Sequence, residues 1–296
     1  MKRVFTAIAC CIIASEIGIL LLLPKVRSYP FHADVVIFSP HPDDAVLGFG
    51  GIIQQKIAAG KSVLVVDVTN GDDFTDHAAA LFHKPIASLT PRDMIRFARI
   101  RQREELMAMK VLGVPSSHVL FLAYPDGMLP DLYTATRAAV YHKATNTYQT
   151  YKASLPDYHF LIHGTHAPYT KLSAEDDIAE IIRDTQPSEI YTTGPLDDAG
   201  DHEAVYRFIR DAMRPGTALY TTVIHAPDWP SPIGITPGLP YDVPKSLPGA
   251  LRIPLTQLQV AKKLSAIDQY NSELLLRDFP LSWFIKSDEV VWQEPN

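Results

Sequence analysis

The sequence predicts an α/β protein with a Rossmann-like, doubly wound and mostly parallel sheet that carries helices on both faces. Two observations lead to this fold class. Short runs of β-branched and other apolar residues recur along the chain, and each has the length of a strand buried on both faces. Stretches of helical length separate these runs, and strands that alternate with helices form parallel sheets.

The expected elements begin with a strand at DVVIF (34–38). A helix at GFGGIIQQKIAAG (48–60) follows and ends at Gly60, and SVLVVDV (62–68) is the second strand. Later in the chain we expect strands at 118–123, 188–193 and 218–226, a helix at 173–186 capped by Ser173, a proline-rich loop over 227–254 and a helix near 255–270.

One helix has the clearest boundary signals in the chain. Thr90 suits the N-cap, Pro91 suits the first helical position, and Asp93 completes a capping-box-like pattern. Gly113 and Pro115 are typical of the C-terminal end. We therefore expect a helix between Thr90 and Gly113.

The N-terminus carries an apolar segment of a different kind. Residues 4–23 are almost all apolar, and basic residues flank them at both ends. Twenty helical residues span about 30 Å, which is the thickness of a bilayer core. Glu16 interrupts the segment and would cost about 2.5–3.5 kcal/mol at the centre of a membrane helix.

We predict a signal-anchor over residues 1–29 and a single folded domain over residues 30–296. The alternative is a cleaved signal peptide that ends near Ser15 or Ser28. The anchored protein is expected on a membrane, in the periplasm or elsewhere outside the cytoplasm, whereas the cleaved protein is expected to be secreted.

Composition restricts the ligands. The net charge is −6 and no run of clustered Lys and Arg is present, so we do not expect a nucleic-acid partner. Both cysteines, Cys10 and Cys11, lie in the N-terminal segment, which leaves the folded domain without a disulfide or a thiolate ligand. Any metal must therefore be held by His, Asp or Glu.

Two polar clusters follow expected strands. His41, Asp43 and Asp44 lie in one turn of SPHPDDAVLGFGG (39–51), at the carboxyl end of a strand, where ligands bind in such sheets. His and carboxylate ligands suit zinc, although an Asp before a helix is also a common N-cap. His202 follows a later strand, where a lone His is most often an ordinary surface residue. Together the clusters match the three-ligand plan of a catalytic zinc site.

HPDD after a first strand, with a later DH at the start of a helix, resembles the PIG-L/LmbE-like family of zinc-dependent de-N-acetylases. Further matching stretches are VTNGDD (68–73), RQREELMAMKVLGV (101–114), YPDGML (124–129) and TTVIHAPDWPSP (221–232). The resemblance implies one zinc ion per chain, held by His41, Asp44 and His202. It also implies that Asp43 is the general base and that Arg101 and Asp126 contact the substrate.

Arg101 and Asp126 also have simpler interpretations. Arg101 has the spacing for an ion pair with Glu104 or Glu105 within one helix. Asp126 precedes Gly127, which is typical of a turn.

Two positions depart from the family pattern. Ala45 stands where the family usually has Glu, and Ala199 stands where it commonly has His. We expect His225, at the end of a strand, to replace the missing His as a catalytic group. His163 and His166 are weaker candidates.

The expected function is removal of the acetyl group from an N-acetylated amino sugar of the N-acetylglucosamine type. Asp43 would accept a proton from the attacking water, and His225 or protonated Asp43 would donate one to the departing amine. The alternatives are a metal-dependent amidase with a non-sugar substrate and a carbohydrate-binding protein that has lost catalysis. A dinucleotide-binding enzyme is disfavoured, because the first strand-to-helix turn lacks the glycine fingerprint.

Overall fold

The computed structural model describes residues 32–135, 138–276 and 280–295. The signal-anchor expected over residues 1–29 lies outside these residues. Among the helices that are described, none is long and apolar enough to cross a bilayer.

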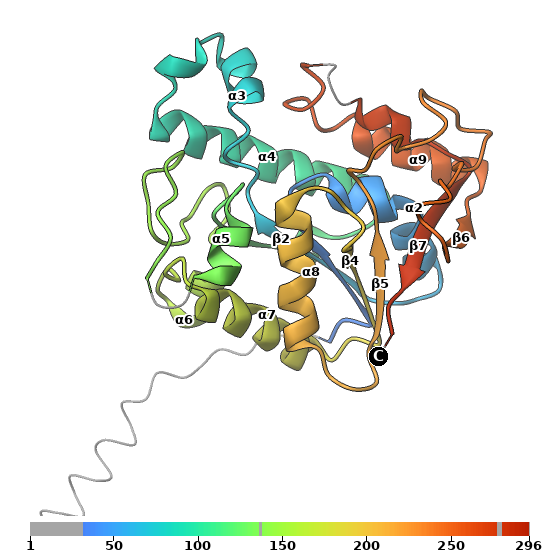
Figure 1. Cartoon of the computed structure of the whole chain (residues 1–296), viewed down its shortest axis with the longest axis horizontal. Helices are drawn as coiled ribbons and strands as arrows, with labels where there is room; N and C mark the ends of the chain where they lie inside the picture. The colour runs from blue at the N-terminus through green and yellow to red at the C-terminus, as the bar shows by residue number, and fades with distance from the viewer. Residues whose placement is uncertain (1–31, 136–137, 277–279, 296) are drawn as a thin grey trace, which may run out of the picture.

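One mixed sheet runs through the protein, with seven strands in the order β3-β2-β1-β4-β5-β7-β6 (Figure 1). Strands β1 to β5 pair in parallel, whereas β7 is antiparallel to both β5 and β6. The expected mostly parallel sheet is thus confirmed, and the β6–β7 edge was not expected. The strands are β1 (Val35–Ser39), β2 (Val63–Thr69), β3 (Val119–Tyr124), β4 (Glu189–Thr193), β5 (Ala218–Thr222), β6 (Leu251–Pro254) and β7 (Asp288–Gln293).

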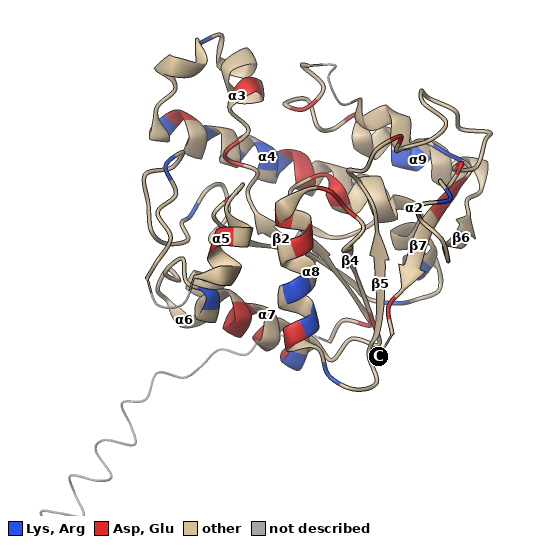
Figure 2. Cartoon of the chain, viewed as in Figure 1, with Lys and Arg blue, Asp and Glu red and all other residues tan. Residues whose placement is uncertain are grey.

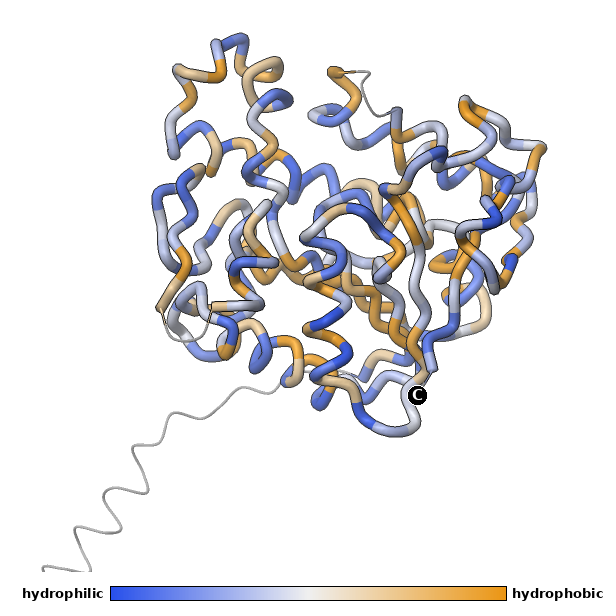
Figure 3. Tube along the Cα trace, viewed as in Figure 1, coloured by the Kyte–Doolittle hydropathy of each residue, from blue (hydrophilic) through white to orange (hydrophobic). Residues whose placement is uncertain are grey.

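Helices cover both faces of the sheet because successive side chains of a strand point to opposite faces. Val35 and Ile37 of β1 pack into one core with α2, α4 and α9, whereas Val36 and Phe38 pack into the other with α5 to α8. Hydrophobic residues accordingly concentrate along the central strands (Figure 3). The helices are α2 (Asp44–Ala58), α3 (Thr75–Phe82), α4 (Pro91–Leu112), α5 (Leu129–Thr134), α6 (Tyr158–His163), α7 (Lys171–Thr185), α8 (Gly200–Ala212) and α9 (Gln257–Ile267).

The helix boundaries agree with most of the capping signals. Thr90 and Asp93 form the expected capping box of α4, and Gly113 ends this helix in the left-handed conformation. The expected cap of α7 was wrong: Thr170 accepts the hydrogen bond from the Ser173 backbone N–H, so the helix begins one turn earlier than Ser173 suggests.

The strand order reverses direction between β1 and β4, and this is where a doubly wound sheet binds ligands. The loops that follow β1 to β5 all reach the carboxyl edge of the sheet at this point. β5 ends at Thr222, sooner than expected, because the backbone beyond it turns toward the loop after β4: the N–H groups of Ile224 and His225 donate to Asp197 Oδ2 at 2.6 and 3.0 Å.

Candidate metal centre and active-site cleft

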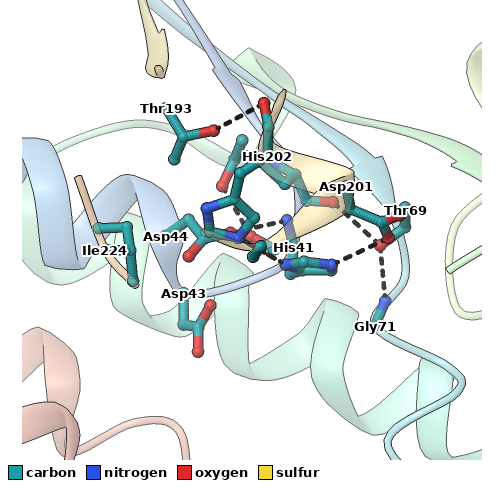
Figure 4. A network of polar contacts seen from close by, with 12 residues as sticks. His41, Asp43, Asp44, Thr69, Gly71, Thr193, Asp201, His202 and Ile224 are labelled. Atoms are coloured by element: carbon teal, nitrogen blue, oxygen red, sulfur yellow. Dashed lines mark hydrogen bonds and ion pairs between the residues drawn. The ribbon is translucent and has the colours of Figure 1, made fainter. Parts of the chain in front are cut away.

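His41, Asp44 and His202 bring three donor atoms together at the carboxyl edge of the sheet (Figure 4). Asp44 Oδ2 lies 3.1 Å from His41 Nδ1 and 3.3 Å from His202 Nε2. The two ring nitrogens are 3.3 Å apart. The turn between β1 and α2 positions the first two residues, and the first turn of α8 positions the third.

The turn that carries these residues is held in an unusual conformation. Asp43 has a φ of 124°, which costs about 1–3 kcal/mol for a residue with a side chain. Ser39 fixes the turn, since its hydroxyl donates to His41 O at 2.6 Å and accepts the Ala45 N–H at 3.1 Å. Ala45, which follows this turn, is fully buried in the core.

Carboxylates also lie beside the second nitrogen of both imidazole rings, the one that does not belong to the donor cluster. Asp197 Oδ2 lies 3.1 Å from His202 Nδ1, while Asp126 Oδ1 and Asp201 Oδ2 lie 3.2 and 3.3 Å from His41 Nε2. Burial lowers the pKa of His202, but the carboxylates of Asp44 and Asp197 outweigh burial and raise this pKa to about 9. These two carboxylates therefore stabilise a positive charge at the His202 ring.

This donor set fits zinc. Donors about 2.0–2.1 Å from a tetrahedral ion lie about 3.3–3.4 Å apart, and the three observed separations are 3.1–3.3 Å. Histidine ligands of zinc commonly have a carboxylate beside their second ring nitrogen, and both rings have one at 3.1–3.3 Å here. His41, Asp44 and His202 would hold the ion, and the remaining position would face the cleft.

Substitution of Asp197, whose carboxylate lies beside the His202 ring, tests this centre. We expect Asp197→Asn to weaken zinc binding by about 10- to 100-fold, because the amide no longer fixes the His202 ring with Nε2 toward the metal. Competition with a chelator measures the affinity. Asp198→Asn is the matched control, since Asp198 is the exposed neighbour. Equal affinities for the two variants would contradict the role of Asp197.

The cleft beside the three donors has a volume of about 480 Å³. His41, Asp43, Asp44, Arg101, Asp126 and His225 all line it. Burial, followed by the charges of Asp44 and Glu273, raises the pKa of Asp43 well above its usual range. The carboxyl of Asp43 lies beside the donor cluster and lines the cleft, where a substrate or water can reach it (Figure 4).

Arg101 lines the cleft and connects separate segments of the chain. Its guanidinium donates to Gly71 O at 3.0 Å and to Pro42 O at 2.8 Å, and it pairs with Glu273 Oε1 at 2.5 Å. Its Nη2 is 3.8 Å from Asp43 Oδ2. Arg101 thus holds the turn of Asp43 in addition to facing the cleft.

The ion pair within α4, which was the simpler interpretation of Arg101, does not form. Glu104 instead accepts hydrogen bonds from the backbone N–H and hydroxyl of Ser272, and Glu105 accepts one from the Tyr270 hydroxyl at 2.6 Å. These contacts fasten the segment after α9 to α4 and bring Glu273 to Arg101.

Asp126 and His225 both reach the metal centre. Asp126 accepts the Asp73 backbone N–H at 2.6 Å, so its carboxylate bridges the loop after β2 and the His41 ring. The rings of His225 and His202 lie 5.0 Å apart in an edge-to-face arrangement. The weaker candidates His163 and His166 do not line the cleft, and they pair with Glu180 and Asp157 instead.

Sequence reasoning missed two carboxylates of this site, Asp197 and Glu273, and gave Asp201 no role beyond its place in the DH motif. Asp197 lies in the loop before α8, so its place in GPLDDAGDH was an available signal. Glu273 belongs to the segment after α9 and carries no recognisable motif, so its position depends on tertiary packing.

A family model described as PIG-L, GlcNAc-PI de-N-acetylase, matches residues 36–213. Among solved structures, the zinc-inhibited form of the teicoplanin deacetylase Orf2 is 16% identical, covers 88% of this chain and 97% of its own, and has a TM-score of 0.56. N,N′-diacetylchitobiose deacetylase from Pyrococcus horikoshii is 17% identical, with coverages of 89% and 84% and a TM-score of 0.52.

GalB, the 4-carboxy-2-hydroxymuconate hydratase from Pseudomonas putida KT2440, is 16% identical, with coverages of 84% and 82% and a TM-score of 0.52. No curated protein sequence gives a significant match. At these identities the three structures share the fold, and the hydratase shows that the fold alone does not determine the reaction.

Proposed function

Because its family model matches more than half of the chain, the protein belongs to the PIG-L family and is a deacetylase of the hydrolase class, and from this premise we propose the substrate. We propose that it removes the acetyl group from an N-acetylated amino sugar of the N-acetylglucosamine type, carried on a glycan or glycoconjugate. The deacetylases of teicoplanin and of diacetylchitobiose support a sugar substrate by analogy.

One observation carries the proposal: the donors of His41, Asp44 and His202 converge beside a cleft that the carboxyl of Asp43 also lines. When bound there, zinc supplies Lewis acidity, which polarises the acetyl carbonyl and lowers the pKa of water to about 7. One ion per chain is sufficient for this chemistry.

The protein groups then move the protons. Asp43 accepts a proton from the water that attacks the acetyl carbonyl, because it is the carboxylate of the turn that is not among the three donors. The departing amine receives a proton from Asp43 or from His225, which also lines the cleft and has its ring 5.0 Å from that of His202. Arg101 and Asp126 contact the sugar in the cleft and also hold the turn and the His41 ring. Acetate and a free amino sugar are the products.

The membrane location is part of the same proposal. The apolar residues 4–23 support a signal-anchor ahead of a domain over 30–296, with the cleft outside the cytoplasm. Cleavage of the segment would instead release the protein.

Acetate release from a substrate panel tests the function. We expect the zinc-loaded full chain to release acetate from N,N′-diacetylchitobiose and N-acetylglucosamine glycosides but not from N-acetyl amino acids. A chelator should abolish this release and added zinc should restore it. Sugar binding without acetate would identify a binding protein that has lost catalysis, and acetate from N-acetyl amino acids alone would identify a non-sugar amidase.

A further inference from the structure

The exposed face of α4 carries a row of four arginines. Arg92, Arg96, Arg99 and Arg103 recur every three or four residues, so they lie on one side of the helix, and all four are exposed. Residues on the opposite side, such as Arg101, face the interior. With Arg101, these residues place five arginines within residues 92–103, so the expectation that the sequence has no clustered Lys and Arg was wrong. The basic residues of α4 are blue in Figure 2.

A groove of about 800 Å³ runs along this row and is separate from the catalytic cleft. Lys84, Arg92, Asp93, Arg96 and Arg99 line it. Asp93 does not neutralise the arginines, because its carboxylate accepts hydrogen bonds from Lys84 Nζ at 2.7 Å and from Thr90 within the capping box.

The guanidiniums are left without anionic partners. No carboxylate among the described residues forms an ion pair with Arg92, Arg96, Arg99 or Arg103, although the whole chain has a net charge of −6. Arg96 is held in place over the ring of Phe82, with 4.7 Å from its Cζ to the ring centroid. Guanidiniums bind phosphate, sulfate and carboxylate groups through paired N–H donors. The groove therefore offers unpaired guanidinium donors to an anionic group.

Helix α3 lies between the groove and the cleft. His77 and Phe74, at the N-terminal end of α3, line the cleft, whereas Lys84, just beyond the C-terminal end, lines the groove. An eight-residue helix is about 12 Å long, so one extended chain can reach both places. The concave shape suits a chain rather than a flat bilayer surface.

We propose that the groove binds the anionic groups of a glycan chain whose N-acetylated sugar enters the cleft. The inference rests on the proposed function, since it defines the substrate as an anionic glycan. Arg92, Arg96 and Arg99 contact phosphate, sulfate or carboxylate groups several sugars away from the acetyl group.

Binding of a defined oligosaccharide tests this site in the zinc-loaded full chain. The probe alternates N-acetylglucosamine and glucuronate, and a chitin oligosaccharide of equal length is the neutral comparator. We expect Arg96→Gln/Arg99→Gln to weaken binding of the anionic probe by about tenfold or more, because two charge-assisted contacts are lost. Binding of the neutral chain should not change. Arg207→Gln/Arg210→Gln on α8 removes two other exposed arginines and should change neither affinity by more than about twofold.

Three results would overturn the proposal: no preference of the wild type for the anionic chain, an equal loss in the α8 variant, or an unchanged affinity in the α4 variant. Vesicles with and without phosphatidylglycerol test the membrane alternative. If the α4 substitutions abolish only the dependence on anionic lipid, the row of arginines faces a membrane and the glycan proposal is wrong. Acetate release from diacetylchitobiose reports separately on the catalytic proposal, because this neutral disaccharide carries no group for the groove.

Discussion

Asp43→Asn is expected to lower kcat by about 10²- to 10⁴-fold while the full content of zinc stays bound. The amide cannot accept the proton of the attacking water, so the reaction loses its base. The metal donors are separate from this side chain, since Asp44 and not Asp43 contacts both histidines. Asn also tolerates a positive φ better than most residues, so the turn should keep its φ of 124°. Acetate release and metal analysis on the same preparation measure the two effects.

Asp268→Asn is a suitable control for this substitution. Asp268 is an exposed residue at the C-terminal end of α9, and the same chemical change there should leave kcat within about twofold. If Asp43→Asn retains near wild-type turnover, another group is the base. If the Asp43→Asn variant loses zinc, Asp43 helps to hold the metal, and the assignment of Asp43 as the base is wrong.

The local parts of the site could be predicted from the sequence. The turn of His41 and Asp44 follows a strand whose apolar run is easy to recognise, and the first turn of α8 follows another. Since parallel strands end at one edge of the sheet, the two turns had to meet there. The capping box of Thr90 likewise depends on residues that are close in sequence.

The long-range parts of the site could not be predicted in this way. The antiparallel pairing of β7 with β5 and the approach of Glu273 to Arg101 join segments that are far apart in the sequence, and no residue pattern specifies them. The arginines of α4 were different, because five of them are visible within residues 92–103 and only the shared helix face of four of them depends on the helix being formed.

Helix α9 and strand β7 also hold α2, the helix that follows the turn of His41 and Asp44. Lys263 of α9 is fully buried, donates to Leu47 O at 2.7 Å and pairs with Glu289 of β7 at 2.7 Å. Glu289 in turn accepts the backbone N–H groups of Gly51 and Ile52 in α2. The family model ends at residue 213, so this support for α2 comes from the part of the chain beyond the matched region.

His202→Ala is expected to leave the purified full chain with almost no zinc and no measurable acetate release. The side chain supplies one of three donors, and its loss also leaves Asp44 and Asp197 as buried carboxylates without their shared cation. Because a fully buried ring is removed, we would measure His202→Gln in parallel, which fills most of the volume and cannot replace the imidazole donor. Circular dichroism confirms that each variant is folded.

His163→Ala is the control that makes the zinc measurement specific. His163 belongs to a second group of potential ligands, with His159 and Asp177, which lies away from the cleft. We expect one zinc per chain in the wild type and in His163→Ala, and none in His202→Gln. Full zinc in a folded His202→Gln variant would exclude His202 as a ligand. Loss of zinc in His163→Ala alone would place the ion between α6 and α7, away from the cleft that Asp43 lines, and the hydrolytic mechanism would then have no metal.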